Sequence, residues 1–512
     1  MCRTPVEVVL AALSVIAFVT PDSAADVVIL NKPAEQRLSF EDCLRIAKER
    51  NHTRPASRFA VAMAEAQHRQ AMAAYWPQIT AKGGWTQLSD SPNFMFPSSM
   101  MYIPSQSVSV PGGSTLVTIP ANSFGPGFPP VAVQMPVSFP GQTVSTQPQI
   151  FPIPQQNIKL ADPTNFTAEG NFTWLLFDGG MRKGYREQSA GGVDAARADA
   201  RRTDLELTDS VVRLYYGALL ARRLRQVGED TLERMEVTLE LTDSMYKNGA
   251  GRVNKTDYLD TVTTVETIRV MVAELEKNEA AAEAALAYTI GLEWNATVRP
   301  SEQEVPYRPY AGNLDELVSS AYEFNPDWAR LEAGLRAGNG ELSTARSGFF
   351  PKIALTGSLH RWWNGYNEGM ATSVNKEGWS IGVGVEIPLF DGFLSKNKMQ
   401  EALANISKLK EQRMLLREGI GLQLRELFLA LEAAGKSYQA AEKAMKAATE
   451  NRELTSRAYQ SELVDTEKVI RCQLFEALMT AQYEKSRYDM LEIESRISTV
   501  VGKEVAGKLD PR

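Results

Sequence analysis

The chain has 512 residues, of which 44% are hydrophobic and 23% charged, and its formal net charge is −7. It is too long for one ordinary globular domain, so two or more packed or repeating units are expected. Acidic and basic residues are interspersed, and this balance argues against a protein that binds nucleic acid.

The N-terminus has the pattern of a secretory signal over residues 1–25. A short basic start is followed by an apolar run from Val8 to Val19 and by the small-residue cleavage pattern Ser23-Ala24-Ala25. The apolar run, about a dozen residues, is too short for a membrane helix, and no later segment approaches the required length. Cys2 has no lipobox around it, so lipidation is not expected. We therefore predict an exported chain that is periplasmic, extracellular or an outer-membrane β-barrel.

The mature chain keeps two cysteines, Cys43 and Cys472, which are far apart in sequence. Two isolated thiols are more typical of inert core residues than of a disulfide bridge.

The sequence repeats one plan twice. Two landmarks recur after 274 residues and two recur after 213. The pairs are Asn51 and Asn325, Pro77 and Pro351, Asp178 and Asp391, and Tyr246 and Tyr459. From the proline to the aspartate the first half has 101 residues and the second has 40, so the first half carries 61 extra residues. We therefore predict a first repeat over residues 26–300 and a second over 301–512, each opening with helices.

Each repeat contains two segments in which apolar and polar residues alternate, at about 77–88 and 165–177 and at about 351–363 and 378–390. This period of two predicts strands with one apolar and one polar face. Five of the eight tryptophans lie in or beside these segments: Trp85, Trp174, Trp362, Trp363 and Trp379. Such strands suit a barrel that spans a bilayer. A soluble sheet packed on helices explains the alternation as well.

The extra residues of the first repeat lie in an insertion at 91–158, between its two strands. This stretch contains no Asp, Glu, Lys, Arg or His and has thirteen of the 26 prolines. Proline-rich polar loops of this length are usually irregular or disordered. We interpret the insertion as a tolerated surface loop, with a plug, a receptor or a surface-interaction loop as the functional alternative.

A short phrase ends the second strand of each repeat, LFDGGMRK at 176–183 and LFDGFLSK at 389–396. An Asp followed by Gly reverses the chain or starts a helix, and the Asp side chain can cap the amides that follow. Asp178-Gly179 and Asp391-Gly392 are therefore predicted as the strand-to-helix junctions.

Long helical hairpins are predicted after both phrases, at 181–292 and 394–501. In the second, apolar or small residues step by four and three: Ile420, Leu424, Leu427, Leu431, Ala434, Tyr438, Ala441, Met445 and Ala448. The positions 213 residues earlier repeat this coiled-coil seam with one charged exception, Arg225. Gly249 and Gly251 mark the first turn, and the second lies near Ser461–Asp465. Each long helix could extend on the order of 100 Å.

Four strands cannot close a barrel, which needs about eight or more, and lipid tolerates no open sheet edge. If these strands lie in a membrane, several copies of the chain must contribute to one barrel. A trimer would supply twelve strands.

Together these features resemble the TolC family of outer-membrane efflux and export proteins over essentially the whole mature chain. The resemblance rests on the two repeats, Asn51, Asn325-Pro326 and the phrases YWPQI, FFPKI and PLFDGF. It implies an α+β membrane protein, a homotrimer with a twelve-stranded β-barrel in the outer membrane and an α-barrel in the periplasm. It also implies two partners, a periplasmic adaptor (membrane fusion protein) and an inner-membrane transporter.

Members of this family often carry Asp residues near the periplasmic tip that constrict the pore. Here the first hairpin reads DYLDT, with Asp257 and Asp260 on one helix face, and the matching phrase of the second, KVIRC, has Lys468 and Arg471. This differs from members whose acidic ring lies in the second hairpin. Our hypothesis is that acidic and basic tips pair across the ring and hold a closed gate; ordinary solvated tip charges are the alternative.

The resemblance also implies that tip glycines help an adaptor to dock. Gly249 and Gly251 fit that role in the first hairpin, but Glu462 stands at the matching position of the second. We therefore expect adaptor contacts to differ between the two hairpins.

No catalytic, cofactor-binding or metal-binding pattern is present. The only histidines, His52, His68 and His360, lack ligand spacing, and no nucleotide or nucleophile motif occurs. His360 is interpreted as a membrane-interface residue at a strand end.

The sequence thus predicts a passive trimeric outer-membrane duct for efflux of small molecules, driven by an inner-membrane pump. Two alternatives stay open: a duct for type I protein secretion, and a periplasmic coiled-coil scaffold that never enters the membrane. The sequence does not specify the substrate, the pump and adaptor, or the resting state of the gate.

Overall fold

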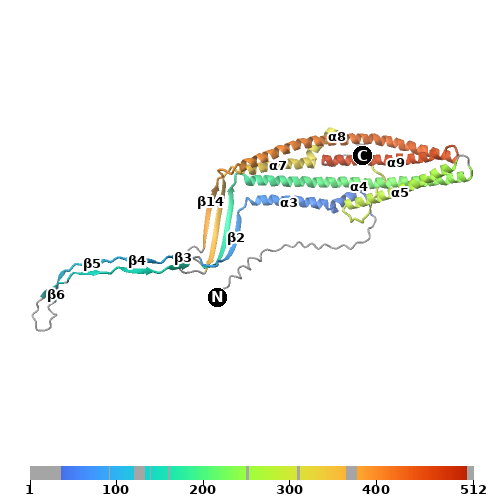
Figure 1. The fold of residues 1–512 in the computed structure, drawn as a ribbon. Helices are drawn as coiled ribbons and strands as arrows, with labels where there is room; N and C mark the ends of the chain where they lie inside the picture. Colours follow the sequence, from blue (N-terminus) through green and yellow to red (C-terminus); the bar gives the residue numbers. More distant parts are fainter. Residues whose placement is uncertain are drawn as a thin grey trace. The chain divides into compact units, whose positions relative to one another are not determined.

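The computed structural model describes residues 36–91, 93–119, 133–138, 140–159, 162–249, 253–307, 312–364 and 377–503. The predicted signal at 1–25 and the tip residue Gly251 lie outside these ranges. Two compact units are present, one formed by residues 1–72, 180–347 and 391–512 and the other by 73–179 and 348–390 (Figure 1). The first is helical and the second is built of strands, and each sequence repeat contributes to both.

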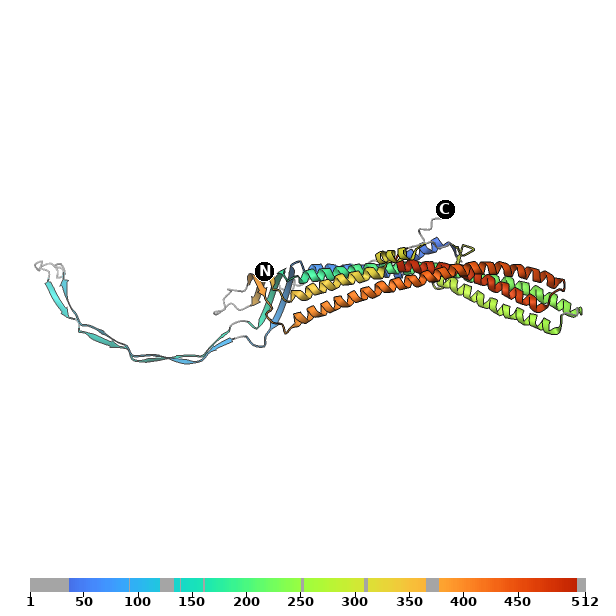
Figure 2. The same ribbon diagram turned by 90° about the horizontal axis from the view of Figure 1, so that it is seen from above.

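The helical unit holds eight helices over the described residues. They are α2 (Phe40–Arg50), α3 (Thr53–Ala73), α4 (Met181–Lys247), α5 (Lys255–Thr289), α6 (Leu314–Phe324), α7 (Pro326–Ser347), α8 (Leu394–Gln460) and α9 (Thr466–Val501). The long helices α4 and α8 have 67 residues each. Each forms a hairpin with the helix that follows it, α5 or α9, and Figure 2 shows the two hairpins side by side. A short parallel pair, β1 (Gln36–Leu38) and β12 (Val298–Pro300), joins the two ends of the first repeat.

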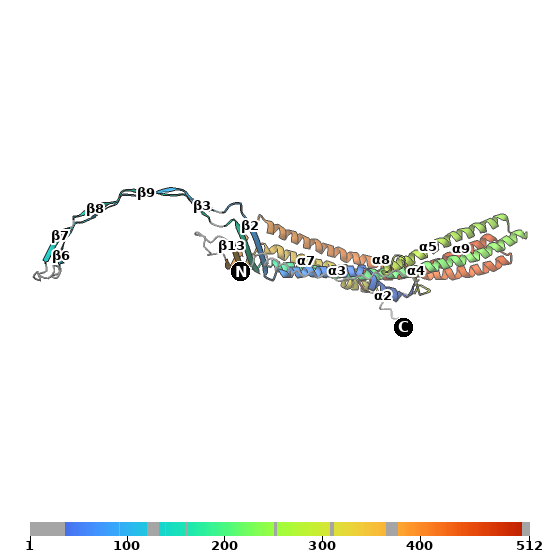
Figure 3. The ribbon, with the colours of Figure 1, turned by 90° about the horizontal axis from the view of Figure 1, so that it is seen from below.

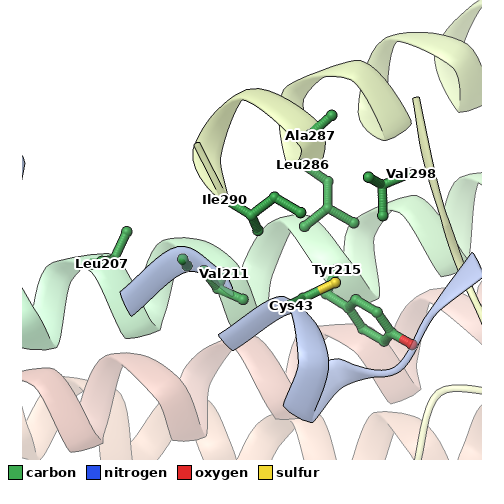
Figure 4. Close-up of a cluster of buried hydrophobic side chains, with 9 residues drawn as sticks. Cys43, Leu207, Val211, Tyr215, Leu286, Ala287, Ile290 and Val298 are labelled. Atoms are coloured by element: carbon green, nitrogen blue, oxygen red, sulfur yellow. The ribbon is translucent and has the colours of Figure 1, made fainter. Parts of the chain in front are cut away.

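The predicted coiled-coil seams form the core of this unit. Leu207, Val211, Ile420 and Leu424 are all buried. Figure 4 shows how α2, α4 and α5 converge at one cluster, in which the Cys43 thiol lies among Leu207, Val211, Tyr215 and Leu286. Cys43 and Cys472 are both buried and free, as predicted.

Small residues let α4 and α7 approach closely. A side chain at Gly184 would lie 2.6 Å from the Gly340 carbonyl oxygen, and one at Gly340 would lie 2.6 Å from that of Gly184. Neither position has room for a Cβ. The charged exception of the seam, Arg225, is neutralised within its own hairpin, since it pairs with Glu229 and Glu279.

The asparagine landmarks perform the same task in both repeats. The Asn51 amide donates to the Thr289 carbonyl and the Asn325 amide donates to the Val500 carbonyl, each at 2.7 Å. Both side-chain oxygens accept from an amide of the next helix, Thr53 or Trp328. Each asparagine thus closes one helix, opens the next and ties both to the end of its hairpin.

The strand unit contains a four-stranded antiparallel sheet in the order β14-β13-β11-β2. Its strands are β2 (Gln78–Gln87), β11 (Thr164–Phe177), β13 (Lys352–Asn364) and β14 (Glu377–Glu386). The alternating pattern had suggested a last strand reaching residue 390, but β14 ends at Glu386. Pro388 has no amide to donate to a ladder, which explains the earlier end.

The insertion at 91–158 is not irregular where it is described, contrary to expectation. It is an antiparallel two-stranded ribbon of paired segments: β3 (Asn93–Phe96) with β10 (Gln156–Lys159), β4 (Ser99–Ile103) with β9 (Gln149–Ile153), β5 (Ser107–Val110) with β8 (Gln142–Ser145), and β6 (Ser114–Ile119) with β7 (Val133–Ser138). Figure 3 shows the segments following one another along it. Prolines stand at the breaks, including Pro97, Pro104 and Pro111, so they interrupt the ladder without ending the pairing.

Candidate functional site

The two faces of the four-stranded sheet differ in polarity. One face carries large apolar side chains from all four strands: Ile79, Trp85, Phe166, Trp174, Leu359, Trp363, Trp379, Ile381, Val383 and Val385. All of these side chains are exposed in the single chain. The face also carries Arg361, whose guanidinium lies over the Trp363 ring and 3.6 Å from Glu377. An apolar face with aromatic residues near strand ends is what a lipid-facing surface requires.

The opposite face is polar and has a row of titratable groups across its middle. Lys82 pairs directly with Glu169, which pairs with His360, which pairs with Gly378. A side chain at Gly378 would lie 2.7 Å from the His360 ring, so this glycine makes room for the imidazole. His360 therefore lies on the polar face, four residues before the end of β13, and its interpretation as a membrane-interface residue stays a prediction.

Both outer strands of this sheet, β2 and β14, have one unpaired edge over the described residues. An apolar face toward lipid and an open edge are incompatible within one chain, because unpaired backbone groups in hydrocarbon cost several kcal/mol each.

The strand-to-helix junctions have the same backbone in both repeats. Gly179 and Gly180 both have positive φ, and so do Gly392 and Phe393, which occupy the equivalent positions. The Asp391 carboxylate accepts from the Ser395 amide at 2.8 Å. The hydrogen bond with the Ser395 side chain, followed by that with its amide, lowers the pKa of Asp391 below its ordinary value. Asp178 is buried at the first junction. The repeated LFDG phrase therefore encodes a left-handed turn at which each long helix begins.

The first hairpin turn contains Gly249, Asp257 and Asp260. Gly249 has φ +68°, a left-handed conformation that favours glycine. Asp257 takes part in a capping box: the Asn254 side chain accepts from the Asp257 amide at 3.0 Å, and the Asp257 carboxylate accepts from the Asn254 amide at 2.9 Å. Asp260 is exposed one turn further along α5. The spacing of Asn254 and Asp257, three residues apart, is the sequence signal from which this cap could have been predicted.

The second hairpin turn places Glu462 where the first has Gly249, again with positive φ at 56°. Lys468 and Arg471 are exposed on α9. No ion pair joins either of them to Asp257 or Asp260 within the described part of the chain. The four predicted gate residues thus lie near the ends of the two hairpins, and their role in a gate stays a prediction.

A row of buried polar contacts lies between α4 and the second hairpin and was not predicted from the sequence. We call it the polar seam; it consists of Thr242–Tyr459, Thr238–Gln473, Arg234–Glu476 and Arg223–Glu484, with distances of 2.8, 2.9, 3.1 and 3.2 Å. The Tyr459 hydroxyl also lies 3.0 Å from the Thr466 hydroxyl. The one available signal was that Thr231, Thr238 and Thr242 are spaced for a single helix face. The polar seam holds α4 against the second hairpin near the tips.

Exposed leucines follow the outside of α8 at heptad spacing. Leu415, Leu422 and Leu429 are seven residues apart and between 55% and 71% exposed. A repeating apolar stripe of this kind is a helix-packing surface.

No group of three or more His, Cys, Asp or Glu side chains suited to a metal ion occurs among the residues described. Over the same residues, none of the helices combines the length and the apolar character needed to cross a membrane. His68 contacts the Ser189 hydroxyl at 2.9 Å.

Sequence relatives of this chain include Protein CyaE of Bordetella pertussis, 26% identical over 270 residues, and outer membrane protein OprJ of Pseudomonas aeruginosa, 29% identical over 268 residues. These matches cover 52% and 49% of this chain, and they span only 56% and 51% of the two relatives. Among solved structures, the outer membrane protein VceC of Vibrio cholerae superposes with a TM-score of 0.67 at 12% identity, over 91% of this chain and 96% of that one. The fold is therefore that of outer-membrane channel proteins along nearly the whole chain.

The sequence pattern of the outer membrane efflux proteins matches residues 143–292 and 317–503. It thus covers both hairpins, β11, β13 and β14, the elements that carry the two-faced sheet and the tips. This match confirms the predicted resemblance and the outer-membrane location, and it decides against a periplasmic scaffold. The chain belongs to the outer membrane efflux protein family.

Proposed function

We propose that this protein is a passive homotrimeric duct through which an inner-membrane pump expels small molecules across the outer membrane. The observation that carries the proposal is the open-edged, two-faced sheet. Three copies that pair β2 of one chain with β14 of the next give a closed barrel of twelve strands, with the apolar faces toward lipid. Closure removes the two free edges that one chain leaves.

The exposed leucine stripe supports the same assembly in the helical unit. Leu415, Leu422 and Leu429 would be covered by a helix of the neighbouring copy in a ring of helices. The duct has no catalytic site and no energy source of its own in this proposal. Energy comes from the pump, which is joined through a periplasmic adaptor.

The tips serve as gate and docking surface. Pairing of Asp257 and Asp260 with Lys468 and Arg471 between copies would hold the ring closed, each exposed pair contributing roughly 0.2–1 kcal/mol. Gly249, Gly251 and Glu462 are the candidate adaptor contacts. Opening would be a shift of the hairpin ends between two packings.

Type I protein secretion is the second candidate function. The names of relatives include a pyoverdine export protein and a toluene efflux pump component, both from Pseudomonas and both concerned with small molecules. This favours efflux as the first candidate. A deletion strain distinguishes the two: accumulation of a small toxic compound supports efflux, and loss of a secreted protein from the medium supports secretion.

The polar row Lys82, Glu169 and His360 provides the test of the duct itself, because the proposal places it on the water-filled side. Purified protein in planar bilayers should conduct ions, and Glu169→Gln should shift selectivity toward anions while Lys82→Met shifts it toward cations. At a separation of ~8 Å in water one charge contributes roughly 0.5 kcal/mol, with opposite sign for a cation and an anion. The cation-to-anion permeability ratio should therefore change by at least about fivefold.

Arg361→Met is the matched control, since it removes one charge from the neighbouring position of β13 on the apolar face. It should leave selectivity unchanged. A duct lined by the polar face would be contradicted if the protein did not conduct ions. It would also be contradicted if Arg361→Met changed selectivity as much as the two polar-face variants do.

A further inference from the structure

The ribbon (Asn93–Ile119 paired with Val133–Lys159) is the most unusual surface of this protein. Its register is constant along its length: residue n pairs with residue 252 − n in all four segments, from Asn93 with Lys159 to Ile119 with Val133. Each of its two arms spans 27 residues and could therefore extend on the order of 90 Å at ~3.3 Å per residue. It is one continuous hairpin and not a set of separate turns.

Both faces of the ribbon are apolar in the segment formed by β4 and β9. Met101 pairs with Phe151 on one face, and the neighbouring pair, Tyr102 with Ile150, lies on the other. Apart from the partly buried Ile158, the large apolar side chains that are described along the ribbon are between 38% and 77% exposed, from Ile153 to Met100. A ribbon in water would keep one face polar, so both faces need a cover.

An isolated ribbon of this kind also lacks stability. A two-stranded hairpin alone is at best marginally stable in water, and both of its edges present unpaired backbone groups. Lipid cannot cover it, because those edges would stay unsatisfied in hydrocarbon. The interior of the proposed duct is a poor match as well, since that face of the sheet carries Lys82, Glu169 and His360.

The absence of charged residues indicates which kind of surface covers the ribbon. From Ser91 to Ile158 there is no Asp, Glu, Lys, Arg or His. Around a threefold axis, equivalent side chains of the three copies approach one another, so any charge would meet its own copies and repel them. A long stretch that is free of charge, with exposed apolar side chains on both faces of its β4–β9 segment, satisfies this restriction, and identical copies fit it without a separate partner.

We propose that the three ribbons of one trimer pack against each other into a single extension beyond the barrel, an inference that rests on the proposed trimer. The ribbon continues β2 and β11 and so recurs once every four strands around the rim, roughly 19 Å apart at ~4.8 Å per strand. That gap is small against a length on the order of 90 Å. Tethering to one trimer gives the ribbons an effective concentration in the mM range.

Cysteine cross-linking of the full-length protein in detergent tests this packing. Met100→Cys and Met101→Cys place a thiol on either face of the ribbon. The native thiols give a low background, because Cys43 and Cys472 are buried and burial raises the pKa of Cys43 to about 12. Because each variant chain has one reactive thiol, a short bifunctional maleimide should join two chains of a trimer into a covalent dimer in at least one variant, at a rate that does not change on dilution.

Leu359→Cys is the matched control, because β13 lies inside the sheet and its copies are separated by four strands. Its cross-linking should be slower by roughly 100-fold, since a short linker cannot span the four strands between copies and the effective concentration at its reach is then near zero. The oligomeric state is measured in parallel by native mass. A trimer in which both ribbon variants react no faster than the control, or only in proportion to protein concentration, overturns this inference alone. A monomer overturns the proposed function and this inference with it.

Discussion

The two hairpin turns share a left-handed residue, Gly249 or Glu462, but differ in length and in contacts. The first is longer: seven residues separate α4 from α5, and five separate α8 from α9. In the first, Tyr246 is exposed and stacks on Tyr258 across its own turn, with ring centroids 6.0 Å apart. Its counterpart Tyr459 is 3% exposed and contacts Thr242 of the other hairpin.

Equivalent positions of the two repeats therefore need not contribute equally to stability. The first turn is closed by its own capping box and ring stack, whereas the second is held to α4 by the polar seam. If the hairpin ends move during opening, we expect the contacts of the second turn to resist that motion, because buried polar groups cannot be separated without new partners.

The largest effect is expected at Arg234, the charged member of the polar seam on α4. Arg234→Met leaves Glu476, which is 8% exposed, without its partner. We expect the free energy of unfolding to fall by about 2 kcal/mol. This is less than for a fully buried pair, because the Arg234 side chain is 30% exposed. The fall in thermal midpoint of the detergent-solubilised protein measures this loss.

Arg269→Met is the control for that change, since Arg269 forms exposed pairs with Glu236 and Glu266. It should lower the thermal midpoint much less than Arg234→Met does, because exposed ion pairs contribute little to stability. Converting Glu476 to Met as well should restore most of the stability lost in Arg234→Met. Equal midpoints for the two single variants would show that the seam pair is not desolvated.

The tyrosine pair should show the next largest difference. Tyr459→Phe removes the hydroxyl that contacts Thr242 and Thr466, and we expect a loss of about 1 kcal/mol. Tyr246→Phe keeps the ring stack and removes only an exposed hydroxyl, so its effect should lie within about 0.5 kcal/mol. Denaturation of both variants under one set of conditions checks this order, and a reversed order would refute the asymmetry of the turns.

Equivalent left-handed positions should respond differently to substitution. Gly249→Ala places a Cβ at φ +68° and should cost about 1 kcal/mol. Glu462→Gly relieves similar strain at φ 56° but adds freedom to the unfolded chain, so the net change should be below ~0.5 kcal/mol. The thermal midpoints of both variants measure these effects. A strongly stabilised Glu462→Gly variant would mean that strain dominates at this turn.

The smallest expected effect is a pH dependence at the second junction. The pKa of Asp391 is lowered by its hydrogen bonds with Ser395, so this contribution to stability is present above the ordinary value of 3.8 and is lost as the pH falls through the lowered pKa. Asp391→Asn keeps an acceptor but does not titrate. The wild-type midpoint should therefore fall more steeply than that of Asp391→Asn below about pH 4, and parallel profiles would exclude this contribution.

Much of the fold could be predicted from sequence because it is encoded locally and twice. Heptad spacing indicated both long helices, and period-two alternation indicated the four sheet strands within a few residues, apart from the end of β14. The ribbon was missed because its pairing joins Asn93 to Lys159, and its prolines resemble those of a loop. The polar seam was missed because Arg223 and Glu484 are 261 residues apart, and only the packing of α4 on α9 brings them together.

Closure of the open-edged sheet by two further copies of the chain underlies the whole proposed function. Electron microscopy of the protein extracted from outer-membrane fractions in mild detergent is the decisive experiment. We expect a threefold particle with a closed barrel of strands and a long hollow stem of helices. A monomeric particle, or an oligomer in which β2 and β14 keep their free edges, would refute the proposed closure.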